Sequence, residues 1–493
     1  MTLLEQFQNY QKKIQQYGLA SSLLRWDLST ASPKKGKDCK VEAIGFFSSE
    51  SFRLKTAPEY GNLLKTLSAP EQFSQLEPAT QVTIQRCYKN YLRFTRVPQD
   101  FYTEMITTNA RSNTVWEEAK QKKDYALFAP WLDRVISMKK QYLRYIEPDK
   151  DPYQVLLEDY EEGMDMATID SLFTELKEGL IPLIDRIKTL PHPDFTPLKT
   201  YCPVEWQRKV QDMLLSYIGF DFEGGCVAER AHPFTSKLCF GDVRLTNDYD
   251  EYNPLSAMFS AIHEGGHGIF LQNISPVYKD TAVAQVTLMG LHESQSRFLE
   301  NILGRNINFW KPIYGKLREL LPPFREISLE LFTQAINYVH PSMIRVDADE
   351  VTYCLHIILR YELEKAIFYD DVTADRLPSL WNEKMEELLG IRPADDGEGI
   401  LQDMHWANGM FGYFPTYLLG SIYDGMFLQQ VRKELGDLDV LLAEGRILEI
   451  VRWLNEKVHQ HGSLYTGREV IKRVCGQDIS AKPLLEYFYT KYT

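Results

Sequence analysis

The sequence predicts a mainly α fold with one small β-sheet near the middle of the chain. Apolar residues recur at spacings of three and four through most of residues 1–218. Glycines and β-prone runs gather in residues 219–252. Helical spacing then returns and continues to the C-terminus. The 493 residues would allow two or three average domains, but large helical proteins often fold as one unit, so we expect a single domain over 1–493.

The N-terminal part, residues 1–218, is expected to be a series of helices separated by prolines. An acidic run between two of them, Glu158–Glu162, is interpreted as a solvated surface. The helices are expected near Leu3–Leu24, Glu77–Arg96, Phe101–Lys122, Tyr125–Tyr145, Thr168–Leu190 and Val204–Ile218.

Residues 219–252 form the predicted β region. Phe234–Phe240 is β-prone, and Val243–Thr246 alternates with a period of two, which is typical of a strand.

Residues 253–304 are predicted to hold two helices that share a metal ion. His263-Glu264-Gly265-Gly266-His267 matches the His-Glu-x-x-His pattern, and Asn253-Pro254 is a suitable helix start. Residues four apart lie on one face of a helix, so His263 and His267 would reach the same ion. Glu264 would act as a general base on water, which is the zincin arrangement. An ordinary core helix with two incidental histidines is the alternative.

The two glycines inside this helix need a reason. Gly265 and Gly266 each cost about 1 kcal/mol relative to alanine in a helix interior. We therefore expect something to approach the backbone closely there, such as a substrate strand.

A metal ion held by two histidines needs a third protein ligand and an open position. A second helical pattern, from about Val283 to Leu303, carries His292 and Glu293. We predict Glu293 as the ligand. His292 is the alternative, but its side chain would point about 100° away. Glu293 would otherwise form an i,i+4 ion pair with Arg297 on a solvated face.

Residues 305–493 are expected to close the domain with further helices, including Phe309–Leu321, Ile327–Tyr338 and a long one that ends near Phe368. Before that long helix, Arg345 lies between apolar residues and carboxylates. Such an arginine suits bidentate capture of a carboxylate, although a structural ion pair is the commoner role.

Two neighbouring segments, Gly399–Trp406 and Gly409–Tyr417, are rich in glycine and aromatic residues and show little helical periodicity. They suit the wall of a binding site. His405 and a tyrosine from this stretch would donate hydrogen bonds to a developing oxyanion. A buried core histidine is the alternative for His405.

Zincin clefts often carry a small sheet whose edge strand pairs with an extended peptide. His232 and the Asp242–Thr246 run, which contains Arg244, are therefore candidates to line the cleft. A structural hairpin with an Asp242–Arg244 surface ion pair explains the same residues equally well.

Composition excludes several classes of partner. The net charge of −13 disfavours nucleic acid and anionic membrane surfaces. No apolar run reaches the roughly 18 residues of a membrane span, and the N-terminal residues lack the basic and apolar regions of a secretory signal. Seven scattered cysteines without a Cys-x-x-Cys pair fit reduced thiols, so we expect a cytoplasmic protein.

Taken in order, seven motifs resemble those of the thermostable metallocarboxypeptidase (Taq carboxypeptidase) family. The segment Trp26–Thr30 also resembles the N-terminal motif of that family, with Ser32 where methionine is usual. The seven motifs are His232–Phe234, Asp242–Thr246, His263–His267, His292–Gln295, Ile344–Glu350, Gly399–Trp406 and Phe411–Tyr417.

The resemblance implies a zincin-type, almost all-α single domain with a deep central groove, in a cytosolic homodimer. It implies release of single C-terminal residues from peptides with broad specificity, using one zinc or cobalt ion. The expected metal ligands are His263, His267 and Glu293, and the expected catalytic groups are Glu264, His405 and Tyr417. The residues expected to bind the free C-terminus and the substrate are Arg345 first, then Arg244, with Tyr413 and His232.

Two other readings remain open at this point. One is a zinc dipeptidyl carboxypeptidase or oligopeptidase with a similar helical groove. The other is a non-catalytic helical peptide-binding protein with a structural metal, although structural zinc sites usually have four protein ligands, often cysteines.

Overall fold

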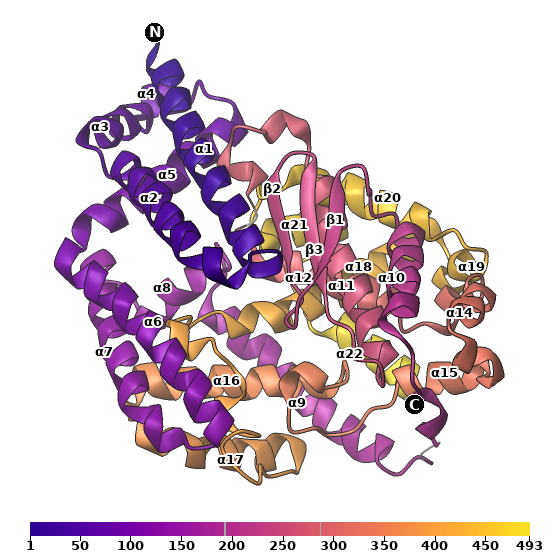
Figure 1. Ribbon diagram of the computed structural model, residues 1–493. Helices are drawn as coiled ribbons and strands as arrows, with labels where there is room; N and C mark the ends of the chain where they lie inside the picture. The colour runs from indigo at the N-terminus through magenta and orange to yellow at the C-terminus, as the bar shows by residue number, and fades with distance from the viewer. Residues whose placement is uncertain (192–193, 286) are drawn as a thin grey trace.

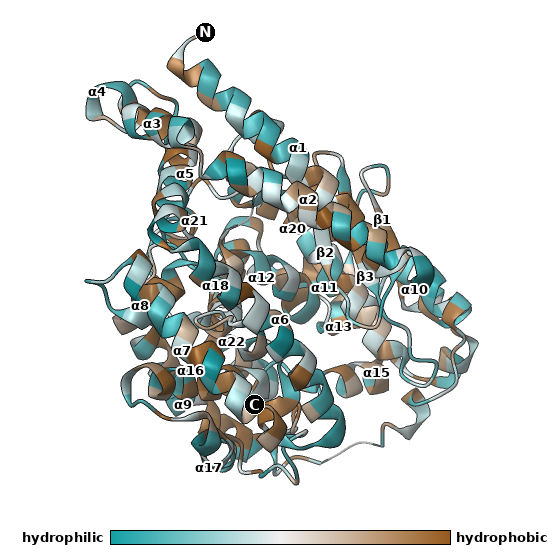
Figure 2. Cartoon of the chain, turned by 60° about the vertical axis from the view of Figure 1, so that its left-hand side comes forward, coloured by the Kyte–Doolittle hydropathy of each residue, from teal (hydrophilic) through white to brown (hydrophobic). Residues whose placement is uncertain are grey.

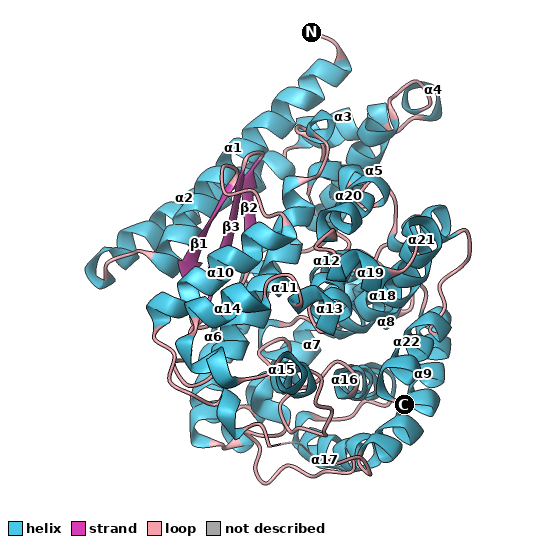
Figure 3. Cartoon of the chain, turned by 90° about the vertical axis from the view of Figure 1, so that its right-hand side faces the viewer, coloured by secondary structure: helices cyan, strands magenta, loops and turns pink. Residues whose placement is uncertain are grey.

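Helices form nearly all of the regular structure, and one small sheet lies midway along the chain (Figures 1 and 3). The computed structural model describes residues 1–191, 194–285 and 287–493. The prediction of a mainly helical single domain with a small sheet beside the metal helix is confirmed.

All six helices predicted in the N-terminal part are present, the fourth as a 3₁₀ turn followed by α7. Four further helices were not predicted: α2, α3, α4 and α8. Helix α2 buries only Ile44 and Ser51, so its sequence carries almost no apolar stripe. The helices of this part are α1 Leu3–Thr30, α2 Lys37–Lys55, α3 Pro58–Leu67, α4 Pro70–Phe73, α5 Pro78–Arg96, α6 Gln99–Lys122, α7 Ala129–Ile146, α8 Pro152–Glu158, α9 Met166–Ile187 and α10 Val204–Ile218.

The first helices have an apolar core of their own, which we call the N-terminal core. They lie at one end of the molecule, whereas α9 and the later helices α16 (Thr352–Tyr369) and α17 (Leu377–Leu389) lie at the other (Figure 1). Hydrophilic residues dominate the visible surface of α1 (Figure 2). The N-terminal core comprises Phe7, Ile14, Tyr60, Leu63, Leu64, Leu67 and Ile84, and it forms a cluster separate from the main core.

The sheet has three strands: β1 Gly225–Glu229, β2 Thr235–Cys239 and β3 Asp242–Asn247. Strand β3 is central, paired in parallel with β1 and antiparallel with β2. The two predicted strands correspond to β2 and β3. Strand β1 was missed because its Gly-Cys-Val-Ala-Glu sequence does not alternate between apolar and polar residues.

The two helices predicted to share a metal ion are α11, Pro254–Gln272, and α12, Met289–Arg297. Helix α11 begins at Pro254, as the start signal predicted. Helix α12 begins six residues later than predicted, because Ala282–Ala284 forms a separate 3₁₀ turn. A π-helical turn, η6 at Phe298–Leu303, follows α12 directly. Val286, within the predicted helix, lies outside the described residues.

The C-terminal part completes the main core, with α16 and α18 buried along most of their length. The predicted helix 309–321 is divided into α13 and α14. Within the described ranges, no helix is long and apolar enough to cross a membrane. The helices are α13 Ile307–Trp310, α14 Tyr314–Leu320, α15 Leu329–Ile336, α16 Thr352–Tyr369, α17 Leu377–Leu389, α18 Phe414–Leu435, α19 Leu438–Ala443, α20 Ile447–Lys457, α21 Gly467–Cys475 and α22 Lys482–Tyr492.

Candidate metal centre

Three donor atoms from α11 and α12 converge on one point. The Nε2 atoms of His263 and His267 lie 3.9 and 3.6 Å from the Oε2 atom of Glu293. All three donors lie within 4.8 Å of one another. Ligands that bind zinc tetrahedrally at about 2.1 Å stand about 3.4 Å apart. The two histidine–glutamate separations are within about 0.5 Å of that value, and the widest separation in the group would have to close by up to about 1.4 Å. The residues therefore fit a divalent ion once the three side chains draw together around it.

The glycines of α11 allow α12 to come close enough to present Glu293. A Cβ atom on Gly266 would lie 2.6 Å from the carbonyl oxygen of Gln295 and 2.7 Å from the Cα of Ser296. Side chains of α10 fill the corresponding space at Gly265. The expectation that a substrate strand approaches these glycines is therefore wrong, because the protein's own helices occupy both positions.

The carboxylate of Glu293 is shared between the histidines and an arginine. Its Oε2 faces the two imidazoles, and its Oε1 lies 3.8 Å from Nη1 of Arg297. The ion pair considered as an alternative is present, but both side chains are buried rather than solvated. Helix α18 packs tightly behind Glu293, since a Cβ on Gly420 would be 3.1 Å from both the Cβ and the Cγ of Glu293.

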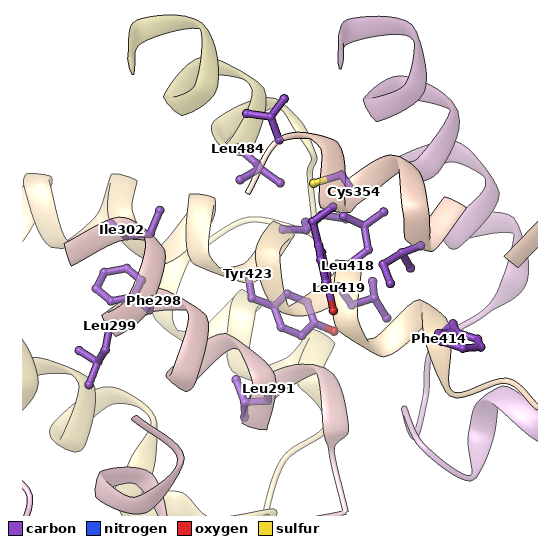
Figure 4. Close-up of a cluster of buried hydrophobic side chains, with 14 of the residues drawn as sticks. Leu291, Phe298, Leu299, Ile302, Cys354, Phe414, Leu418, Leu419, Tyr423 and Leu484 are labelled. Carbon is purple, nitrogen blue, oxygen red and sulfur yellow. The ribbon is translucent and has the colours of Figure 1, made fainter. Parts of the chain in front are cut away.

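Helix α12 is held on all sides although most of its buried residues are polar. Ser294 donates a 2.7 Å hydrogen bond to Asp424, and Arg297 donates a 3.0 Å bond to Ser421; both partners belong to α18. On its apolar side, Leu291 and the following π-helical turn pack into the main core with residues of α18 (Figure 4). The position of Glu293 is therefore fixed by the surrounding fold.

Glu300, in the π-helical turn, fixes the ring of His263 from the other side. Its Oε2 lies 2.9 Å from Nδ1 of His263. A carboxylate at that nitrogen sets the tautomer and orientation of a metal-binding histidine. Burial lowers the pKa of His263, but the bond to Glu300 and the charge of Glu293 outweigh it and raise the pKa to about 9. Sequence reasoning missed Glu300, for which the seven-residue spacing from Glu293 is the only signal.

Glu264 lies beside the donors and is anchored by the sheet. Its Oε2 accepts a 2.5 Å hydrogen bond from the hydroxyl of Thr235 in β2. Burial raises the pKa of Glu264. The side chain is thus a buried carboxylate next to the metal donors, held by a neutral hydroxyl. Thr235 was also missed from the sequence, because nothing in its strand pattern pointed to α11.

His292 packs against the site without joining the donor group. Its ring stacks on that of His267, with centroids 4.2 Å apart and planes 30° apart. Burial lowers its pKa to about 4. Among the described residues, the group of converging donors consists of His263, His267 and Glu293.

A comparison with known proteins places this site in a family. The chain matches the family described as carboxypeptidase Taq (M32) metallopeptidase over residues 6–492. The chain belongs to this M32 family.

The M32 relatives match the whole chain. Carboxypeptidase 1 of Bacillus subtilis is 41% identical over 494 residues, covering 100% of this chain and 98% of the relative. Thermostable carboxypeptidase 1 of Thermus thermophilus is 35% identical, with 98% and 97% covered. The crystal structure of the M32 carboxypeptidase from Deinococcus radiodurans R1 matches with a TM-score of 0.95 at 30% identity, covering 100% and 99%. The chain is therefore a metallocarboxypeptidase of this family, acting on peptides.

In this M32 chain His405, Tyr413 and Tyr417 form an aromatic group that stands beside Glu293. The Nε2 of His405 lies 3.3 Å from the hydroxyl of Tyr417, and the rings of Tyr413 and Tyr417 are 5.3 Å apart. Tyr417 lies in the first turn of α18, one turn before Gly420, so the loop expected up to Tyr417 ends at Tyr413. Residues three apart share a helix face. Tyr417 is therefore on the face of α18 that packs on Glu293.

These aromatic groups are set up as hydrogen-bond donors. Burial, with the charge of Glu293 adding to it, raises the pKa of Tyr413 to about 12, and burial also raises that of Tyr417. Burial lowers the pKa of His405 to about 4. At neutral pH both tyrosines are protonated and the imidazole is neutral, with one N–H to donate.

Arg345 forms a structural ion pair, the role considered above as the alternative to binding a substrate carboxylate. Its Nε and Nη2 donate to Oδ1 of Asp403 at 3.0 and 2.8 Å, and Nη1 lies 3.2 Å from the hydroxyl of Tyr353. The guanidinium also stands 5.1 Å from the ring centroid of Tyr417. The M32 fold therefore brings Arg345 to the aromatic group.

Arg244 and His232 lie in the sheet region. Arg244 forms the pair expected with Asp242, through two bonds of 2.8 Å. His232 is exposed in the bend between β1 and β2. Among the residues that the structure describes, the converging donor group does not include His232.

Proposed function

We propose that the chain is a metal-dependent carboxypeptidase that releases single C-terminal residues with broad specificity, using one zinc or cobalt ion. The observation that carries this proposal is the convergence of two imidazoles and one carboxylate within 4.8 Å, beside the buried carboxylate of Glu264. Two nitrogen donors and one oxygen donor, with a fourth position left for water, suit a catalytic rather than a structural zinc site. The same donor set accepts cobalt.

The proposed chemistry is hydrolysis by activated water. A divalent ion held by His263, His267 and Glu293 would lower the pKa of a bound water towards about 7 and would polarise the scissile carbonyl. Glu264 takes the proton from the attacking water and returns it to the leaving amine. Its burial raises its pKa, which brings the carboxylate closer to the operating pH and suits it to both transfers. The hydroxyl of Thr235 keeps Oε2 of Glu264 in place.

The oxyanion is stabilised by the aromatic group. His405 and Tyr417 are the first choice as donors, with Tyr413 second. Their 3.3 Å contact holds the two side chains together, so little reorganisation is needed when charge develops.

The free C-terminus is bound by an arginine. Arg345 is the first choice and Arg244 the second, and His232 is a further candidate in the sheet region. Because Asp403 already takes Nε and Nη2 of Arg345, a substrate carboxylate would bind at Nη1, where the hydroxyl of Tyr353 now lies. The ring of Tyr417, which faces the guanidinium of Arg345, supports binding of the substrate carboxylate at this arginine.

We further propose a homodimer in the cytoplasm. All seven cysteines are free, which suits a reducing compartment. Sedimentation of the purified chain tests the dimer.

A peptide mixture read by mass spectrometry tests the activity. The zinc-loaded and chelated proteins are each incubated with peptides of known sequence. Steps of one residue from the C-terminus in the loaded sample only are expected. Steps of two residues, or internal cuts, would indicate a dipeptidyl carboxypeptidase or oligopeptidase. Metal binding without any cleavage would indicate a peptide-binding protein.

A further inference from the structure

Glu161 is a fully buried carboxylate in the turn that follows α8. Its side chain is 0% exposed, and no ion pair joins it to a lysine or arginine among the described residues. Interpreting the acidic run Glu158–Glu162 as solvated is therefore wrong for this residue. A buried carboxylate without a cation is costly unless its oxygens accept hydrogen bonds.

The hydrogen bonds of Glu161 lead to the metal helices. Its Oε2 accepts a 2.9 Å bond from the backbone N–H of Gly290, the second residue of α12. Its Oε1 accepts a 2.8 Å bond from the hydroxyl of Tyr423 in α18. The residue before α12, Leu288, has no capping side chain. Glu161 thus supplies the missing cap, where the helix dipole favours a negative charge.

The space for this carboxylate is made by two glycines. A Cβ atom on Gly290 would lie 2.9 Å from Oε2 of Glu161, and one on Gly467, the first residue of α21, would lie 2.5 Å from Oε1. Any larger residue at either position would displace the carboxylate. Residues of three helices, α12, α18 and α21, therefore surround the carboxylate of Glu161 closely.

We propose that Glu161 is a positioning residue of the metal centre, which sets the first turn of α12 and through it the position of Glu293. Glu293 comes only three positions after the capped Gly290, which is less than one helical turn. The turn after α8, which carries Glu161, also touches the aromatic group, since the rings of Tyr160 and Tyr413 meet edge to face at 5.0 Å. This inference rests on the proposed role of Glu293 as a metal ligand.

The test is the affinity for Zn²⁺ alone, measured by competition with a coloured chelator. Glu161→Leu removes the cap and should weaken zinc binding about tenfold, the usual size of an outer-shell effect. Glu161→Gln keeps an acceptor for the N–H of Gly290 and should stay within about threefold of the wild type. Rescue by glutamine would show that the cap matters rather than the charge.

Gly290→Ala gives a second and sharper test, which also applies if Glu161→Leu does not fold. Alanine is the better helix former, so α12 itself would be favoured. The new Cβ, 2.9 Å from Oε2, must nevertheless displace the carboxylate. Zinc binding should therefore weaken about tenfold although helix propensity improves.

Two controls separate the possible causes. Leu67→Ala, in the distant N-terminal core, should lower Tm and leave the zinc affinity unchanged. Glu293→Ala should abolish tight zinc binding. Loss of zinc in Glu293→Ala together with wild-type affinity in Glu161→Leu and Gly290→Ala would overturn the positioning role and leave the proposed function standing. A wild-type protein that binds no zinc would overturn both.

Discussion

Glu300 holds His263 by the nitrogen that faces away from Glu293. The Oε2 of Glu300 lies 2.9 Å from Nδ1, while Nε2 of the same ring faces Oε2 of Glu293 at 3.9 Å. The imidazole is thus held between two carboxylates of one continuous helical segment. Because Nδ1 is engaged by Glu300, Nε2 is left for the metal, and the ring does not have to reorient when an ion binds.

Replacement of Glu300 should therefore weaken metal binding without removing a ligand. Glu300→Ala is expected to reduce zinc affinity about 10- to 100-fold, and Glu300→Gln, which still accepts from Nδ1, should have a smaller effect. Chelator competition at fixed pH measures both. Equal affinities in the alanine variant and the wild type would remove Glu300 from this role.

Glu264→Gln should separate metal binding from turnover. The amide keeps the size of the side chain but is far too weakly basic to take the proton from water. Zinc content should match that of the wild type, and kcat should fall by about 10²–10⁴. The two quantities are read from metal analysis and peptide release on the same sample. Retention of normal kcat would end the assignment of Glu264 as general base.

Glu293 and His292 are adjacent, and their substitutions should affect the metal differently. Glu293→Ala removes a donor that lies 3.6 Å from Nε2 of His267, so zinc binding should be lost or reduced by orders of magnitude. His292→Ala removes only the ring stacked on His267 and should have a much smaller effect. Zinc titrations of the two variants give the ranking, and the reverse order would make His292 the third ligand.

Arg345→Ala should raise KM for peptides with a free carboxylate far more than for C-terminally amidated ones. Breaking the buried ion pair with Asp403 also destabilises the fold, although Asp403 keeps its pair with Arg360, so Tm alone does not identify the role. The ratio of KM for the free-carboxylate peptide to KM for the amidated peptide removes the effect of lost stability, because both substrates are measured on the same variant. Arg244→Ala is the matched control. A selective rise in KM for free-carboxylate peptides in that variant instead would assign the carboxylate-binding role to Arg244.

The sequence predicted which residues would meet, because their signals are local. His263 and His267 are one turn apart, and the second helical pattern needed only to fold back to bring Glu293 near them. The structure brings these three donors within 4.8 Å of one another. The fold class could also be predicted from the sequence, since the spacing of apolar residues indicates amphipathic helices such as α10.

What the sequence did not reveal depends on contacts between distant segments. Nothing in a short acidic run distinguishes the buried Glu161 from its exposed neighbour Asp159, because the difference is made by α12 and α18. Gly266 was expected to receive a substrate, yet it receives the backbone of α12. Such partners are separated by many residues in the chain, and periodicity within one element carries no information about them.

The N-terminal helices are stabilised largely through residues such as Phe7, Leu64 and Ile84, whose cluster is separate from the one around α11 and α18. A segment with its own centre of packing opens at a lower free energy than the whole protein. Amide hydrogens of α1 and α3 should thus exchange with deuterium well before those of the metal-bearing helices. Brief local opening at that end would leave the hydrolytic machinery assembled.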